Sequence, residues 1–226
     1  MKIKKSPWIK ICGITSKKDI DTCIQNNVDA LGFLLEPKSG KYKREDMLQP
    51  TVIKELIKYV PSHIETCLLI HLKDINEVIE TIKELNPSMI QIQKQSKLLL
   101  NDIGTIRQKF PNLKITKTFY IDEGITHEIL IQNIKPYNEN KLIDYVLLDS
   151  TRGGSGITHN WDLSQKIVQS ILPFPVILAG GLTPDNIQNA IKKVTPFGVD
   201  VMSGVSKEDK SKDAKKVYKL INNIRL

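Results

Sequence analysis

Two side chains in this sequence could exchange protons with a bound molecule. Cys12 ends the apolar stretch WIKIC and is followed by a glycine, and Asp149 ends the apolar stretch YVLLD. A carboxyl group at the end of an apolar strand must be hydrogen-bonded, paired or functional, because burying an unpaired charge is costly. A thiol and a carboxyl that face each other could act as a base and an acid, which suits the isomerisation of a sugar phosphate.

Both residues also have ordinary structural interpretations. Cys12 could be a small buried side chain, since free cysteine is among the most buried residue types, and Asp149 could order a loop. A helix is predicted to start shortly after Cys12, and its positive end would lower the pKa of the thiol. We expect Cys23 and Cys67 to be buried, because one lies on the apolar face of a helix and the other inside a strand.

Small residues after two later strands could bind a phosphate group. The pair Gly180–Gly181 precedes a helix predicted to start at Thr183 with Pro184 at its first position, and the pair Ser203–Gly204 follows the last strand. Glycine lets backbone N–H groups approach an anion, and the start of a helix favours negative charge. The alternative interpretation is two tight turns without a ligand.

The strands that would carry these residues alternate with amphipathic helical segments along the whole chain. Several are almost continuous apolar runs, such as TCLLI and PVILAG, which are typical of parallel strands buried on both faces. The predicted strands are Trp8–Ile14, Ala30–Leu35, Ile64–Ile70, Ser88–Gln93, Ile115–Ile121, Tyr145–Ser150, Pro175–Ala179 and Gly198–Met202.

This alternation predicts the fold class. Eight βα units in 226 residues favour a single α/β domain, residues 1–226, that closes as a (β/α)8 TIM barrel. An open doubly wound sheet is the alternative. In a barrel the active site lies at the C-terminal ends of the strands, which is where Cys12 and Asp149 stand.

Composition and charge exclude several other classes. No apolar run reaches the ~20 residues of a membrane span, and no apolar segment of a signal peptide follows MKIKKSPW. The three cysteines form no CxxC pair, so neither a disulfide framework nor a metal site is expected, and the cytoplasm is the natural compartment. The lysines behind the net charge of +8 are scattered over predicted helix faces, so we expect no nucleic-acid partner. The sequence leaves open whether the protein forms a homo-oligomer.

Five stretches of the chain together resemble the phosphoribosylanthranilate isomerase family of tryptophan biosynthesis. The resemblance runs nearly from end to end and keeps the family's order. The stretches are KICGIT, DALGFLLEPKSGKY, LLDS with GGSGITHNW, LAGGLTPDNI and GVDVMSGV.

The resemblance implies an Amadori rearrangement that needs no cofactor and no metal. N-(5-phosphoribosyl)anthranilate, a phosphorylated small molecule, would become 1-(2-carboxyphenylamino)-1-deoxyribulose 5-phosphate. Asp149 would be the general acid that opens the ribose ring, and Cys12 the general base that removes the proton from C2. The implied phosphate-binding residues are Gly154, Gly180, Gly181, Ser203 and Gly204, and the implied substrate-binding residues are Lys41, Gln93 and Asp200.

The sequence departs from the family's usual pattern at the aromatic end of the pocket. Lys41 stands where the family has an arginine that meets the anthranilate carboxylate, and a lysine loses the bidentate contact. Gln93 and Lys94 replace a histidine and a glycine, and Met202 and Ser206 replace a serine and a glutamate. Two alternatives therefore stay open: an isomerase for another ribosyl-phosphate amine, and a non-catalytic barrel that binds sugar phosphates.

Overall fold

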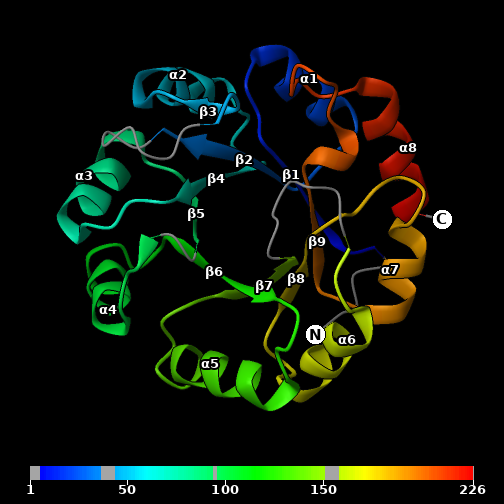
Figure 1. The fold of residues 1–226 in the computed structure, drawn as a ribbon. Coiled ribbons are helices and arrows are strands. Elements are labelled where there is room, and N and C mark those ends of the chain that lie inside the picture. Colours follow the sequence, from blue (N-terminus) through cyan, green and yellow to red (C-terminus); the bar gives the residue numbers. More distant parts are fainter. Residues whose placement is uncertain (1–5, 37–43, 94–95, 151–157, 226) are drawn as a thin grey trace.

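The strands form one closed parallel barrel, as Figure 1 shows in a view down its axis. The structure is a computed structural model that describes residues 6–36, 44–93, 96–150 and 158–225. The strand order is β1-β9-β8-β7-β6-β5-β4-β2, and the pairing of β1 with β2 closes the ring. The barrel strands are β1 (Trp8–Cys12), β2 (Ala30–Leu35), β4 (Glu65–Ile70), β5 (Met89–Ile92), β6 (Lys114–Ile121), β7 (Tyr145–Ser150), β8 (Val176–Leu178) and β9 (Gly198–Val201).

The closed ring confirms the predicted (β/α)8 barrel, and the open doubly wound sheet is wrong. One further strand was not predicted. The two-residue strand β3 (Met47–Leu48) pairs with the end of β2 through Leu34 and Leu35. A strand this short has no periodicity that a sequence pattern could reveal.

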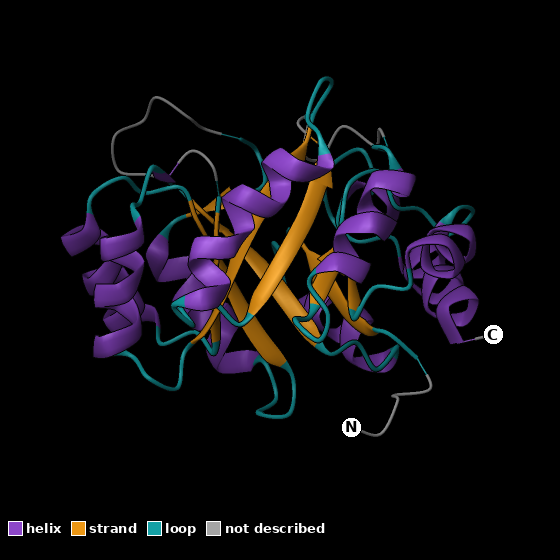
Figure 2. Ribbon diagram, turned by 90° about the horizontal axis from the view of Figure 1, so that it is seen from below, coloured by secondary structure: helices purple, strands orange, loops and turns teal. Residues whose placement is uncertain are grey.

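Helices surround the barrel on its outer side (Figure 2). They follow the barrel strands in the alternation that the sequence predicts. The helices are α1 (Lys17–Gln25), α2 (Pro50–Tyr59), α3 (Ile75–Leu85), α4 (Leu100–Lys109), α5 (His127–Glu139), α6 (Trp161–Ser170), α7 (Ile187–Val194) and α8 (Ala214–Arg225).

The predicted start of the helix after β8 is wrong by about one turn. That helix, α7, begins at Ile187, not at Thr183, and Pro184 lies in the turn before it. The Asn186 side chain orders this turn, because its Oδ1 accepts the Thr183 N–H at 2.8 Å and its Nδ2 donates to the Gly181 carbonyl at 2.9 Å.

Side chains along β1 alternate between the barrel interior and the layer of helices. Ile9 and Ile11 belong to the large core between strands and helices, whereas Trp8 and Cys12 pack inside the barrel. Lys10, between them on the same face, is fully buried. This alternation, with a period of two residues, points the Cys12 side chain into the barrel mouth. Cys23 and Cys67 are also buried and free, as predicted.

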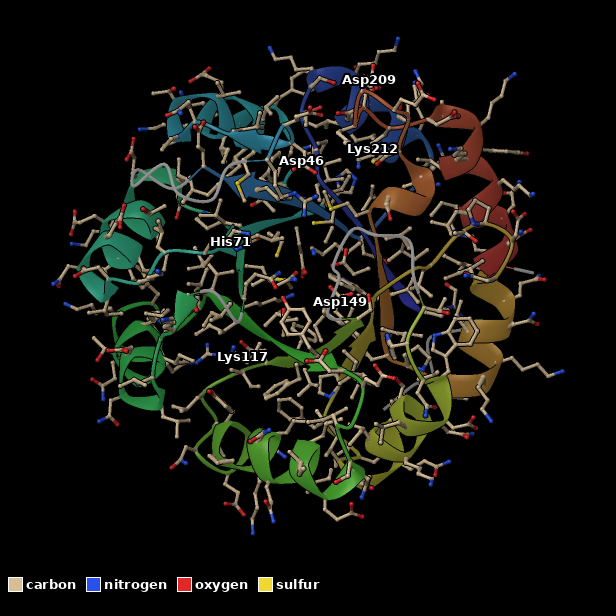
Figure 3. The ribbon with its side chains drawn as sticks, in the orientation of Figure 1. Asp46, His71, Lys117, Asp149, Asp209 and Lys212 are labelled. Carbon is tan, nitrogen blue, oxygen red and sulfur yellow. The ribbon has the colours of Figure 1, made fainter. Side chains whose placement is uncertain are left out.

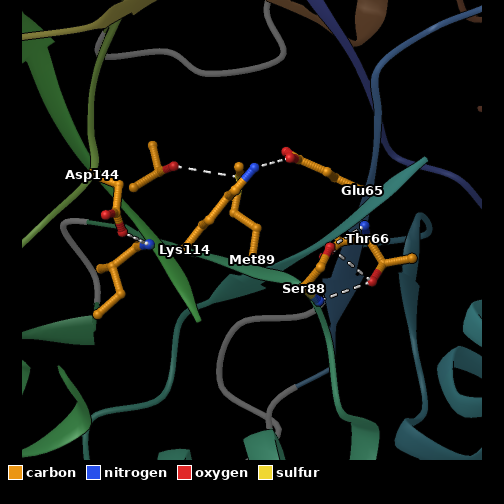
Figure 4. A network of polar contacts seen from close by, with 8 residues as sticks. Glu65, Thr66, Ser88, Met89, Lys114 and Asp144 are labelled. Atoms are coloured by element: carbon orange, nitrogen blue, oxygen red, sulfur yellow. Dashed lines mark hydrogen bonds and ion pairs between the residues drawn. The ribbon is translucent and has the colours of Figure 1, made fainter. Parts of the chain in front are cut away.

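Polar contacts join the strands at the N-terminal end of the barrel, opposite the strand ends that carry Cys12 and Asp149 (Figure 4). Lys114 forms an ion pair with Glu65, and Ser88 Oγ accepts the Thr66 N–H at 2.7 Å. These residues lie at the starts of β4, β5 and β6, so their contacts stabilise the barrel without approaching its mouth. None of the described helices is long and apolar enough to cross a membrane.

Candidate active site

Cys12 lies at the C-terminal end of β1, with its side chain in the barrel mouth and only 3% of it exposed. Its partner in the β1–β2 register is Gly32. A β-carbon at Gly32 would lie 2.7 Å from Cys12 Sγ and 3.1 Å from Lys10 Cε, so the thiol occupies space that only glycine leaves open. Sequence reasoning missed Gly32, because only its pairing with Cys12 across the two strands shows that it makes room for the thiol.

The pKa predicted for Cys12 is wrong in direction. Burial raises the pKa of the thiol to about 11 instead of lowering it. The helix that was expected to favour the thiolate starts at Lys17, and the Ser16 hydroxyl caps it by accepting the Asp19 N–H at 3.2 Å. The Asp19 carboxylate accepts the N–H groups of Thr15 and Ser16 at 3.0 and 3.1 Å, and its negative charge offsets the positive end of α1.

Asp149 lies near the end of β7, inside the ring of strands (Figure 3). Burial, and after it the nearby Asp200, raise the pKa of its carboxyl to about 7. The Ser150 N–H donates to Asp149 Oδ1 at 2.7 Å, which partly offsets the effect of burial. Near neutral pH both forms are populated, which suits a group that gives and recovers a proton.

Gly180 packs directly against Asp149. Its φ of +80° is in the left-handed region, and a β-carbon there would lie 2.7 Å from Ser150 N and 2.9 Å from Asp149 Oδ1. The same β-carbon would lie 3.1 Å from His159 Nδ1. Glycine at this position therefore makes room for the carboxyl group as well as bending the chain.

The two glycine loops predicted to hold a phosphate lie side by side. A β-carbon at Gly204 would lie 2.0 Å from the Leu182 carbonyl oxygen, so the turn after β9 packs on the backbone after β8. Gly181 adopts a φ of +65° next to Gly180, and Ser203 begins the short 3-10 helix Ser203–Val205. The structure thus brings these predicted residues together, while the Thr183 N–H is already bound to Asn186.

A buried ion pair lies beneath the barrel mouth. Lys10 Nζ donates to Asp200 Oδ2 at 2.6 Å and to Gln91 Oε1 at 2.7 Å, and Gln91 Nε2 donates to Thr118 Oγ1 at 3.3 Å. Asp200 Oδ1 is buried without a partner among the described residues, so it is the atom that could accept a hydrogen bond from a ligand. Sequence reasoning selected Asp200 and missed Lys10, because a single lysine within an apolar strand forms no motif.

Gln93 follows β5 and reaches the barrel mouth from the side of the ring opposite Asp200 on β9. Its side chain is buried, and its Oε1 accepts a hydrogen bond from the Tyr120 hydroxyl at 2.6 Å. Tyr120 was missed because it sits in β6, which carries no recognisable motif. Two other predicted residues, Lys41 and Gly154, lie outside the described residues.

Lys212 is the second buried lysine near Cys12, and sequence reasoning also missed it. Figure 3 shows it near the connection between β9 and α8. Lys17 and Lys192 are exposed on their helices, as predicted, whereas Lys212 is buried in the segment before α8. Among the described residues, no group of three or more His, Cys, Asp or Glu side chains could hold a metal ion.

Comparisons with known proteins agree on one family. The family model described as N-(5'phosphoribosyl)anthranilate (PRA) isomerase matches residues 9–223. A protein of Methanosarcina acetivorans named N-(5'-phosphoribosyl)anthranilate isomerase is 35% identical, over 96% of this chain and 92% of its own length. The structure of N-(5'-phosphoribosyl)anthranilate isomerase from Pyrococcus furiosus has a TM-score of 0.79 at 27% identity, covering 97% of this chain and 98% of its own.

A more distant solved structure shares the fold. It is a phosphoribosyl anthranilate isomerase in complex with reduced 1-(O-carboxyphenylamino)-1-deoxyribulose 5-phosphate, with a TM-score of 0.76 at 20% identity. The match covers 97% of this chain and 98% of that one. The whole barrel, and not a part of it, is therefore what these proteins have in common.

Proposed function

The chain belongs to the N-(5'-phosphoribosyl)anthranilate isomerase family, and we propose that Cys12 and Asp149 carry out its reaction. The enzyme catalyses the Amadori rearrangement of N-(5'-phosphoribosyl)anthranilate to 1-(2-carboxyphenylamino)-1-deoxyribulose 5-phosphate, a step of tryptophan biosynthesis. This is an isomerisation of an aminoaldose into an aminoketose, so every proton removed from the substrate is returned to it at another atom.

Asp149 is proposed to open the ribose ring. Its carboxyl gives a proton to the ring oxygen while the bond between that oxygen and C1 breaks, and the anthranilate nitrogen supplies the electron pair that forms a C1=N iminium. Support comes from the pKa of about 7, which keeps a protonated carboxyl available near neutral pH in a buried site.

Cys12 is proposed to act next, on the opened chain. Its thiolate removes the proton from C2, and the electrons move to form an enolamine between C1 and C2. A proton then adds to C1 and the C2 hydroxyl loses its own, which leaves the ketone. The observation that carries this assignment is that Cys12 and Asp149 both stand inside the barrel at the ends of their strands, β1 and β7.

The rest of the mouth suits a phosphorylated substrate. The adjoining loops at Gly180–Gly181 and Ser203–Gly204 offer backbone close to a phosphate, and glycine permits that approach. Asp200 Oδ1 could accept a hydrogen bond from a ribose hydroxyl. We propose that the anthranilate ring lies toward Gln93, whose buried side chain is held by the Tyr120 hydroxyl.

Substitution of each proposed catalytic residue tests this assignment. We expect Cys12→Ala and Asp149→Asn to lower kcat by ~10²-fold or more, with KM close to that of the wild type. Cys23→Ala is the matched control, because it removes a buried thiol from α1 without touching the mouth, and its kcat should be unchanged. Wild-type kcat in either Cys12→Ala or Asp149→Asn would rule out the proposed role of that residue.

The cellular setting is a separate proposal. We propose that the enzyme works in the cytoplasm, because its three cysteines are free thiols, as is usual in a reducing compartment. It is also proposed to act on a small molecule without a nucleic-acid partner. A homo-oligomer stays a prediction, which light scattering of the purified protein would test.

A further inference from the structure

Lys212 is buried next to the residue that follows Cys12. Only 4% of Lys212 is exposed, and a β-carbon at Gly13 would lie 3.3 Å from its Nζ. Within the described residues its side chain donates to a neutral group, since Nζ donates to Ser206 Oγ at 2.9 Å. Among the ion pairs of the described residues, Lys212 has none.

The carboxylates around Lys212 are bound to other groups. Asp19 on α1 accepts the backbone N–H of Lys212 at 2.8 Å, and also the N–H groups at the start of its own helix. Asp46 is held by two hydrogen bonds from Arg44, at 2.9 and 2.7 Å. Cys23, the other titratable group nearby, is a buried thiol. Asp19 and Asp46 therefore act on the Lys212 ammonium group from nearby, and neither forms an ion pair with it.

Two cations and two other titratable groups face Cys12, and they differ in how far they are neutralised. Lys10 lies on the same strand but is in direct contact with Asp200 on β9, so their effects on Cys12 oppose each other. Cys67 on β4 is a buried thiol that contributes no positive charge. Lys212, from the segment before α8, is the remaining cation, and no direct carboxylate contact offsets it.

We propose that Lys212 is a positioning residue that favours the thiolate form of Cys12 and so makes the thiol available as a base. The proposal rests on the proposed function, in which Cys12 removes the proton from C2. Lys212 acts through Cys12 and touches no substrate atom in this account. The physical basis is ordinary: an ammonium group beside a thiol in a buried site stabilises the negative form of the thiol.

The ionisation behaviour of both groups agrees with this arrangement. Burial raises the pKa of Cys12 to about 11, while Lys10 and Lys212 act to lower it. Burial also lowers the pKa of Lys212, and Cys12 opposes this shift more strongly than any other group. Each group thus makes the charged form of the other more favourable.

Lys212→Met tests the proposal through the thiol itself. The rate of alkylation of Cys12 by iodoacetamide, followed at that peptide by mass spectrometry from pH 7 to 10, reports the fraction of thiolate. We expect Lys212→Met to shift this profile upward by about one pH unit or more, which slows alkylation roughly tenfold at a given pH. The kcat/KM measured at pH 8 should fall by a similar factor, and Lys212→Arg should restore both.

A second variant offsets the charge of Lys212 without removing the lysine. Ser206→Glu places a carboxylate beside Lys212 Nζ, so it should shift the alkylation profile in the same direction. Lys216→Met is the matched control, because the exposed Lys216 also contacts Ser206, through its carbonyl at 3.0 Å, and should leave the profile unchanged. Circular dichroism of each variant verifies that it is folded.

The outcomes separate this inference from the proposed function. An unchanged alkylation profile in Lys212→Met and Ser206→Glu would overturn the role of Lys212, whatever their activity. An equal shift in Lys216→Met would overturn it as well. A shifted profile combined with a fully active Cys12→Ala would instead reject Cys12 as the base, while the effect of Lys212 on the thiol would stand.

Discussion

Replacing Asp149 by asparagine should change the shape of the pH dependence of kcat/KM. The proposed mechanism needs Cys12 as a thiolate and Asp149 as a protonated carboxyl at the same time. Their pKa values lie in the opposite order, at about 11 for Cys12 and about 7 for Asp149. Between these values most molecules carry the single shared proton on sulfur, and only a minority carry it on the carboxyl.

The size of that minority follows from the two pKa values. A separation of about four pH units makes the active form about 10⁻⁴ of the enzyme between pH 7 and 10. Over this range each tenfold gain in thiolate is cancelled by a tenfold loss of protonated Asp149. The wild-type kcat/KM should therefore be level. In Asp149→Asn only Cys12 titrates, so the residual kcat/KM should rise about tenfold per pH unit.

The assay follows the change in fluorescence of the anthranilate group at low substrate concentration, because kcat/KM reports the free enzyme. Measurements start at pH 7, above the titration of a phosphate monoester at about pH 6. A wild-type kcat/KM that falls tenfold per unit above pH 7 would mean that Cys12 is already ionised there. A level profile in Asp149→Asn would remove Asp149 from the pair.

Three further predictions follow from the burial of the same groups. Burial raises the pKa of Asp149 from 3.8 to about 7, so its contribution to stability is lost as the pH rises between these values. Urea unfolding should show Asp149→Asn gaining about 4 kcal/mol over the wild type between pH 4 and 8, three pH units at about 1.36 kcal/mol each. Gly180→Ala, which crowds Asp149, should lower both stability and kcat, whereas Gly124→Ala has a similar positive φ with nothing within 4 Å and should lower stability alone. Lys10→Met should cost about 3–5 kcal/mol of stability by leaving Asp200 unpaired, and the double variant with Asp200→Leu should recover most of it.

The fold could be predicted because each strand has a local sequence pattern that identifies it. Near-continuous apolar runs identify parallel strands, and eight of them with intervening helices leave few arrangements other than a barrel. The start of α7 was misplaced because Thr183 and Pro184 carry a valid start signal, but the side chain of Asn186 orders a turn there instead. Local sequence does not tell whether the residues after Pro184 continue as a helix or as a turn.

The site could be predicted in its positions but not in its electrostatics. Cys12 and Asp149 follow from the rule that barrel sites lie at strand ends. The contact between Lys10 and Asp200 joins residues 190 positions apart, and that of Asp19 with the backbone of Lys212 joins residues 193 apart. Such contacts exist only after the barrel closes. The pKa of Cys12 was predicted in the wrong direction because burial, which also exists only in the closed barrel, outweighs the positive charges near the thiol.

One physical cause, burial, has opposite consequences for the proposed acid and for the proposed base. It raises the pKa of Asp149 toward neutrality, which helps a group that must carry a proton, and it raises the pKa of Cys12, which hinders a group that must lose one. Further burial of the barrel mouth would leave more of Asp149 protonated and less of Cys12 as thiolate. A cation beside the thiol but remote from the carboxyl relieves this conflict, since it stabilises the thiolate without ionising the acid. Lys10 influences both Cys12 and Asp149, whereas Lys212 figures among the groups that act on Cys12 and not among those that act on Asp149. Lys212 is for this reason the better placed of the two to activate the base selectively.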